Sequence, residues 1–138
     1  MHITARVDYA LQTMVALAES EHTPVPAIEI AERLDLSYTY LLTIVGELRR
    51  AGFITMRRGP AGGLQLAKPA QSITLGEIVT AIDGPLTLAD GTQPETAADH
   101  AADGLLPSLW ATAHQAMMDV LSQVRLSEAR STRAADPA

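Results

Sequence analysis

The chain has 138 residues, of which 47% are hydrophobic and none is cysteine, and it carries a formal net charge of −6. This length and composition suit one compact globular domain with a hydrophobic core and one appended element. The lack of cysteine excludes disulfides, thiolate zinc sites and cysteine-ligated iron–sulfur clusters. No apolar run approaches the ~20 residues of a membrane span and no secretory signal opens the sequence, so we expect a cytoplasmic protein.

The negative charge is unevenly distributed along the chain. Residues 1–70 carry seven acidic and seven basic side chains, whereas residues 71–138 supply the whole net charge of −6. Residues 48–76 contain no acidic residue. Their basic residues are Arg49, Arg50, Arg57, Arg58 and Lys68. A local basic strip of this kind favours contact with phosphate even on an acidic protein.

Three helices are predicted in the first part of the chain. Apolar residues within residues 3–20 recur at steps of three and four, as they do on one face of a helix. Pro26 suits the first position of a second helix that runs to Leu34, because proline lacks the N–H that this position leaves unbonded. Ser37 suits the N-cap of a third helix, and Gly52 suits the left-handed position just beyond its end.

A β-hairpin and a fourth helix are predicted next. Strand-like runs at 53–58 and 64–67 flank a loop rich in glycine and proline, a pattern typical of a hairpin. Thr74 and Glu77 have the spacing of a capping box. The sequence therefore predicts a helix over residues 75–82.

The remainder of the chain is predicted to contain a loop, a long helix and a tail. Residues 86–104 are polar and acidic with no clear period, so we expect a long loop. Apolar residues between Leu105 and Val124 predict a helix, and the residues after it are typical of a disordered tail. We expect a mainly α fold with a small β-hairpin wing. Its predicted parts are 1–84 (winged helix-turn-helix), 85–104 (loop), 105–126 (long helix) and 127–138 (tail).

The order of these elements indicates a DNA-binding protein. Two helices joined by a short turn form a helix-turn-helix unit, and a basic hairpin directly after them makes a winged helix. The N-terminal end of the helix at Ser37 can enter the major groove, and Arg58 suits the narrow minor groove. Glycines let the hairpin approach the phosphates closely. The residues expected to contact DNA are Ser37, Tyr38, Thr39, Tyr40, Thr43, Arg49, Arg57, Arg58, Gly59, Gly62 and Gly63.

Other classes of protein explain less of the sequence. A pair of helices alone also occurs as an ordinary helical hairpin, so the basic hairpin in the correct order is the stronger signal. The chain has no phosphate loop before a helix, no nucleophile elbow and no zinc signature, so we do not expect an enzyme. A winged helix that assembles with another protein remains the alternative, although protein contact does not require the acid-free strip at 48–76.

Several longer motifs run through residues 1–86. The most specific is Arg58-Gly59-Pro60-Ala61-Gly62-Gly63-Leu64-Gln65-Leu66-Ala67-Lys68-Pro69. The others are Tyr9-Ala10-Leu11, Ile30-Ala31-Glu32-Arg33, Ser37-x-x-Tyr40-Leu41, Leu48-Arg49-Arg50-Ala51-Gly52-Phe53-Ile54, Ile73-Thr74-Leu75-Gly76-Glu77-Ile78-Val79 and Ala81-Ile82-Asp83-Gly84-Pro85-Leu86. On these motifs the chain resembles the winged-helix transcriptional regulator family of IscR, NsrR and CymR.

The resemblance implies a bacterial regulator that binds a palindromic operator as a homodimer, with repression as the simpler expectation. It also implies that the long last helix is the dimerisation helix and crosses its twin. The apolar stripe expected there is Leu106, Leu109, Ala113, Met117, Val120 and Val124. Packing of this stripe within one chain is the alternative, but an appended helix has little except a second copy to pack on.

The chain departs from the family in the sensing region. Family sensors carry three cysteines in the loop after the Asp-Gly-Pro segment, whereas residues 86–104 contain none, so we expect no cysteine-ligated cofactor. The departure extends to the reading helix, where Leu42-Thr43 replaces a Glu-Gln pair of the iron–sulfur regulator. We therefore expect a different operator preference.

A sensor for a small molecule or a metal within residues 86–110 is a further alternative. The loop offers acidic and imidazole side chains, but their spacing matches no metal motif, and a solvated acidic loop explains them. These side chains are Asp90, Glu95, Asp99, His100 and Asp103. Trp110, the only tryptophan, is expected in the core or the dimer interface. The alternative is an effector pocket formed by Leu88, His100 and Trp110.

Overall fold

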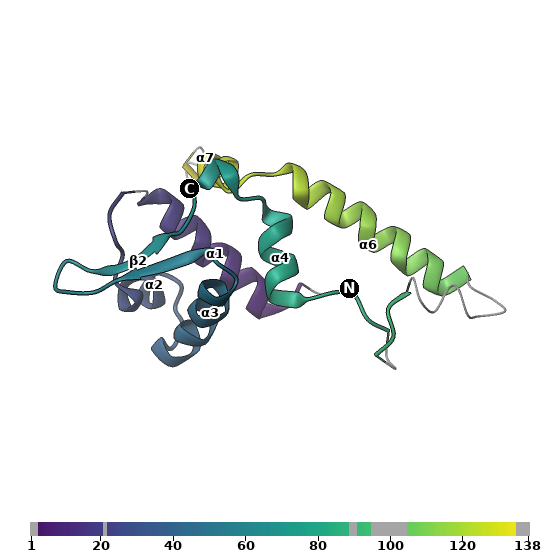
Figure 1. The fold of residues 1–138 in the computed structure, drawn as a ribbon, viewed down its shortest axis with the longest axis horizontal. Helices are drawn as coiled ribbons and strands as arrows, with labels where there is room; N and C mark the ends of the chain where they lie inside the picture. The colour runs from purple at the N-terminus through teal and green to yellow at the C-terminus, as the bar shows by residue number, and fades with distance from the viewer. Residues whose placement is uncertain (1–2, 21, 89–90, 95–104, 135–138) are drawn as a thin grey trace.

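The computed structural model describes residues 3–20, 22–88, 91–94 and 105–134, with the side chains of 131–134 left out of the description. The helices are α1 (Ala5–Glu19), α2 (Ala27–Arg33), α3 (Tyr38–Arg50), the 3-10 helix η1 (Ala70–Ser72), α4 (Leu75–Asp83), α6 (Leu105–Gln123) and α7 (Leu126–Ala134). The strands are β1 (Ile54–Arg57) and β2 (Gly63–Leu66). Figure 1 shows a compact body from which α6 extends at one end and the hairpin at the other.

Helix α1 is the centre of the core. Thr4 caps its first turn by accepting a hydrogen bond from the backbone N–H of Val7, and seven of its fifteen residues are buried. This helix contacts α3, α4 and α7 as well as strand β2. Thr13 is buried within this apolar surface, and its hydroxyl donates to the carbonyl of Tyr9. Burial of this polar group is therefore compensated by a hydrogen bond.

Helices α2 and α3 form the predicted helix-turn-helix. Pro26 precedes α2 as its N-cap instead of occupying the first helical position, a shift of one residue from the prediction. Asp35 adopts φ 53° in the turn, and the N–H of Leu36 donates to the carbonyl of Ala31 at 2.9 Å. The predicted positive φ of Gly52 after α3 is confirmed at 85°.

The hairpin is anchored to the chain that precedes α2. Strands β1 and β2 pair antiparallel, from Ile54 opposite Leu66 to Arg57 opposite Gly63. Val25 forms an isolated bridge with Leu64, in which each backbone N–H donates to the other residue's carbonyl. The base of the wing is therefore held by the segment that leads into the helix-turn-helix.

Helix α4 begins at Leu75, as the sequence predicts, and ends at Asp83, one residue later than predicted. Thr74 and Glu77 form both bonds of the capping box, and Gly84 takes φ 73° at the C-terminal end. The face of α4 that contacts α6 includes Gly76, where an added Cβ would come within 2.6 Å of the Ser122 hydroxyl oxygen. The absence of a side chain at Gly76 is what allows α6 to approach α4 this closely.

The tail predicted over residues 127–138 is wrong over 127–134, which belong to helix α7 (Leu126–Ala134), and 135–138 lie outside the described residues. Leu126 is fully buried, and its N–H donates to the carbonyl of Ile73 at 2.8 Å. The Glu128 side chain accepts from the N–H of Arg125, while the Arg125 guanidinium donates to the carbonyl of Gln71. These contacts return the chain to the body, so the long helix ends at Gln123 and not near residue 126. None of the helices in the described part of the chain has the length and apolar character needed to cross a bilayer.

Candidate nucleic-acid interface

The N-terminal end of α3 is open to solvent. Ser37 is its N-cap, and the Ser37 hydroxyl oxygen accepts from the N–H of Tyr40 at 3.1 Å. The first turn contains no acidic residue, and Ser37, Tyr38 and Thr39 are exposed. The free N–H groups and the positive end of the helix dipole therefore face solvent, which is the arrangement that binds phosphate.

Tyr40 lies on the flank of α3 that faces α1. Its ring meets the ring of Tyr9 edge-on, with the centroids 6.1 Å apart and an angle of 89° between the planes. Tyr40 is half-buried, whereas Thr43 is exposed on the outer surface of the helix. Of the residues predicted on this helix, Tyr38, Thr39 and Thr43 are exposed together, and Tyr40 is partly used in packing.

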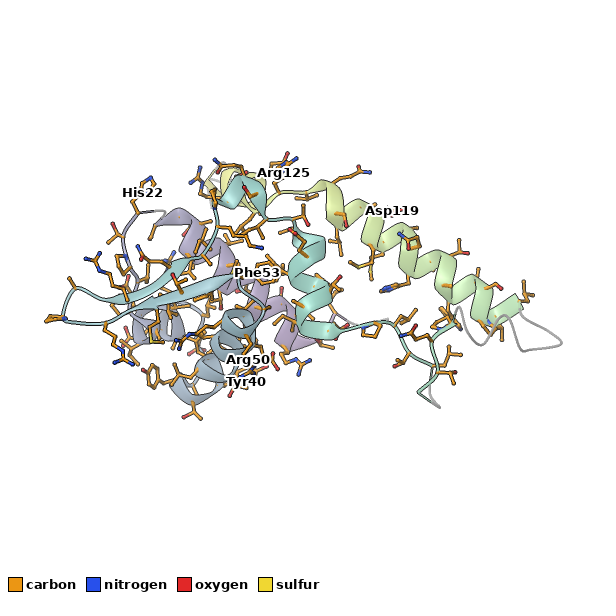
Figure 2. All side chains as sticks on the ribbon, in the orientation of Figure 1. His22, Tyr40, Arg50, Phe53, Asp119 and Arg125 are labelled. Carbon is orange, nitrogen blue, oxygen red and sulfur yellow. The ribbon has the colours of Figure 1, made fainter. Side chains whose placement is uncertain are left out.

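Two residues on the outer face of α3 were missing from the predicted contacts. Leu41, Ile44, Val45 and Leu48 are buried, so the opposite side of the helix carries Thr39, Leu42, Thr43 and Arg50. Leu42 and Arg50 are both exposed, as is the predicted Arg49. Figure 2 labels Tyr40 and Arg50 on α3, which forms the lower edge of the body in this view. This outer face could have been predicted from the sequence, because the spacing of the buried apolar residues of α3 shows which side of the helix faces away from the core.

The tip of the hairpin is basic and exposed. Arg57 ends β1, and Arg58 lies directly before the turn that returns to β2. Gly59 takes φ 105° with open space around it, as close approach to a partner requires. Gly62 and Gly63 have a different role, because an added Cβ would overlap the carbonyl of Arg57 and the backbone of Val25, respectively. Close packing within the chain therefore explains why glycine stands at two of the three wing positions that were predicted to contact DNA.

The arginines of the acid-free strip are available for a partner. The ion pairs Arg6–Glu47 at 3.3 Å and Arg33–Glu19 at 2.7 Å lie in the described part of the chain, and neither uses a residue of 48–76. The Lys68 ammonium lies 5.4 Å from the centre of the Phe53 ring. The exposed arginines without an acidic partner there are Arg49, Arg50, Arg57 and Arg58.

Arg6 fixes α3 against the rest of the body. Its guanidinium donates to Glu47 on α3 and also to the carbonyl of Ile82 at 2.6 Å, near the end of α4. One side chain thereby connects three helices. The only acidic residue of α3, Glu47, is held on the α1 side and away from the outer face.

An apolar cavity of about 600 Å³ lies between α1, α4 and α6. Leu88 and Trp110, two of the three residues proposed for an effector pocket, both line it. The third, His100, lies outside the described residues, as do Asp90, Glu95, Asp99 and Asp103. The predicted loop can therefore be compared with the structure only up to Leu88 and over residues 91–94.

The predicted stripe on α6 divides between two surfaces. Ala113 and Met117 line the cavity, facing α1 and α4 of the same chain. The other members within the helix are largely exposed: Leu106 at 60%, Leu109 at 52% and Val120 at 63%. Val124 lies beyond the end of α6, and its carbonyl accepts from the N–H of Leu75. All residues of α6 belong to the described part of the chain, and none of them is buried.

The helix-turn-helix, its hairpin and the exposed basic strip define a winged helix-turn-helix transcriptional regulator, a DNA-binding class of protein. The comparisons with known proteins agree with this class. The family model described as Rrf2, iron-dependent transcriptional regulator, matches residues 3–130. The chain belongs to the Rrf2 family.

Individual relatives support the same assignment. The chain is 33% identical over 129 residues to the HTH-type transcriptional regulator IscR of Klebsiella pneumoniae, covering 93% of this chain and 78% of the relative. The T. potens IscR structure superposes with a TM-score of 0.77 at 28% identity, covering 99% of this chain and 89% of the other. The structure of CymR, the global cysteine regulator of B. subtilis, gives 0.75 at 27% identity, covering 96% and 98%.

The family description mentions iron, but the residues of this chain do not fit a cysteine-ligated iron–sulfur cluster. An iron–sulfur cluster is held by cysteine thiolates, and the sequence contains no cysteine. In the described residues, no three His, Asp or Glu side chains converge as metal ligands would. The function proposed below therefore does not depend on an iron–sulfur cluster.

Proposed function

We propose that the chain represses transcription as a homodimer bound to a palindromic operator. In this arrangement α3 lies in the major groove, and the hairpin lies against the adjacent minor groove. The proposal is carried by two observations on a chain of net charge −6. The N-terminal end of α3 is exposed and has no acidic residue in its first turn, and exposed arginines without acidic partners stand in the last turn of α3 and on the hairpin. Exposed positive side chains of this kind bind the phosphates of DNA.

The contacts follow from the positions of the side chains. The hydroxyl of Ser37 and the N–H groups behind it suit a phosphate, and Thr39 and Thr43 suit base edges. Arg49, Arg50 and Arg57 suit phosphates, and Arg58 at the hairpin tip suits the minor groove. These groups position the protein on DNA and do not require a catalytic residue, so we propose that the chain is a regulator and not an enzyme. We also propose that it acts in the cytoplasm, where the chromosome lies.

The proposed dimer supplies the symmetry of the operator. The exposed apolar residues Leu106, Leu109 and Val120 provide a self-complementary surface on a helix that projects from the body (Figure 1). A two-fold dimer presents two copies of α3, so it favours two inverted half-sites about one helical turn apart, ~34 Å. A winged helix used for protein assembly would lack this preference.

Fluorescence anisotropy with a duplex selected from a random library tests the proposal. We expect specific binding that weakens steeply between about 50 and 200 mM salt, because each arginine–phosphate contact releases counterions. Arg50→Ala is expected to weaken binding to all sequences alike and to lower the salt slope by about one for each copy.

Arg125→Ala is the matched control. Arg125 is also an exposed arginine, but it lies on the opposite side of the body from Arg50 (Figure 2) and donates to the carbonyl of Gln71. Its replacement is expected to leave the affinity and the salt slope unchanged. Equal, weak retention of every duplex at low salt would reject the proposed function and favour a protein partner.

A further inference from the structure

The outer face of α3 has an unusual chemical character for a helix that reads DNA. Its exposed residues over the first two turns are Tyr38, Thr39, Leu42 and Thr43, and no charged side chain lies among them. Glu47 is held toward α1 by Arg6. The positive side chains, Arg49 and Arg50, are in the last turn.

The hydrogen-bonding capacity of this face is further reduced within the helix itself. The Thr43 hydroxyl donates to the carbonyl of Thr39 at 3.2 Å. Its proton is therefore used, and Thr43 offers a partner an acceptor oxygen and a methyl group. Leu42 offers only hydrocarbon and is 37% exposed. Its neighbour one turn earlier, Tyr38, is 47% exposed.

These side chains exclude most forms of direct base reading. Guanine is read by Arg or Lys, adenine by Asn or Gln, and cytosine by Asp or Glu, and none of these stands on the first two turns of this face. The major-groove feature that an exposed aliphatic side chain recognises is the C5-methyl group of thymine. Burial of that methyl group also removes part of the exposed Leu42 surface from water.

We propose that Leu42 is a specificity-determining residue that packs on a thymine methyl group in each half-site of the operator. The inference rests on the proposed function and adds the chemistry by which α3 selects a sequence. One buried methyl group corresponds to roughly a threefold to fivefold gain in affinity. Two half-sites bound by a dimer multiply that factor.

Thymine-to-deoxyuridine replacement in the selected duplex tests the proposal. Deoxyuridine pairs like thymine and lacks only the C5-methyl group. With the wild-type protein, replacement of one particular thymine in both half-sites is expected to weaken binding roughly tenfold, and the other replacements are expected to be neutral. With Leu42→Ala, the thymine and deoxyuridine duplexes are expected to bind equally.

Ile28→Ala is the matched control for the variant. Ile28 is also an exposed aliphatic residue, at 50%, but it lies on α2. This variant is expected to keep the full preference for thymine. Thermal unfolding of both variants within a few degrees of the wild type checks that the fold is intact.

The possible failures are distinguishable. If the wild-type protein binds its operator specifically and every deoxyuridine replacement is neutral, the reading by Leu42 is wrong and the proposed function stands. If Leu42→Ala keeps the thymine preference, another residue reads the methyl group and the assignment to Leu42 is overturned. A wild-type protein that selects no duplex at all overturns the proposed function and this inference together.

Discussion

Arg58 lies between the end of β1 and the left-handed Gly59, directly before the turn in which the N–H of Gly62 donates to the carbonyl of Gly59. Its guanidinium is exposed, and the described part of the chain gives it no acidic partner. A narrow minor groove concentrates negative potential that attracts such a group. Among the exposed arginines, Arg58 is therefore the one whose contribution we expect to depend on sequence.

We predict that Arg58→Ala weakens operator binding by about 1–3 kcal/mol, and that Arg58→Lys recovers only part of the loss. The dissociation constants at fixed salt measure both effects. A loss confined to operators with A·T pairs beside the half-site would agree with groove reading. An unchanged dissociation constant for Arg58→Ala would remove this side chain from the interface.

At the residue scale, the sequence predicted local features such as helix caps, but it did not reveal contacts between distant parts of the chain. Ser37 was predicted as an N-cap from its residue type, and the structure agrees because capping is a local property. Gly62 and Gly63 were assigned to DNA approach, yet the backbones of Arg57 and Val25 already require glycine there. That requirement depends on contacts across the chain, which a loop motif alone does not reveal.

At the element scale, two glycines in helices have opposite surroundings. An added Cβ at Gly46 in α3 would meet only the Arg50 side chain, at 3.5 Å, whereas at Gly76 in α4 it would come within 3.1 Å of the Ser122 backbone nitrogen. We predict that Gly46→Ala stabilises the protein by about 0.5–1 kcal/mol, since alanine restricts the unfolded chain.

Gly76→Ala provides the matched comparison. It gains the same helix propensity but forces α4 and α6 apart, so we predict a net destabilisation of about 1–3 kcal/mol. Denaturant unfolding without DNA measures both free energies. The same sign for the two variants would show that the α4–α6 contact does not depend on the small size of Gly76.

The elements that the sequence predicted correctly carry local signals. The capping box at Thr74 and Glu77 and the glycine after α3 lie within a few residues of the structure they specify. Helix α7 has a polar sequence, and its order depends on distant contacts of Leu126 with the chain near Ile73. Arg130 likewise donates to the carbonyl of Ala18, across more than a hundred residues. Composition alone therefore favoured a tail.

At the scale of the whole molecule, exposed positive charge and exposed apolar side chains lie on different elements. The hairpin and α3 carry exposed arginines. Helix α6 projects from the body (Figure 1), and Leu106, Leu109 and Val120 on it are exposed. A helix that exposes this much apolar surface indicates an interaction site. A second copy of α6 is the partner that the proposed two-fold operator requires.

We predict that Leu109→Glu separates the proposed dimer into single chains, because two-fold symmetry would place the new charge in the interface twice. Gln115→Glu adds the same charge elsewhere on α6, where Gln115 is exposed and donates to Asp119, and is expected to remain dimeric. Sedimentation velocity at micromolar concentration distinguishes the two. Dimeric Leu109→Glu would exclude this face of α6 from the interface.

The mass of the operator complex, measured by sedimentation equilibrium, tests most directly whether two copies bring their α3 helices and wings to one duplex. The expected result is two chains of 14.7 kDa on each duplex for the wild type and Gln115→Glu, with no stable complex for Leu109→Glu. A single chain bound to each duplex with full sequence preference would contradict the proposed dimer.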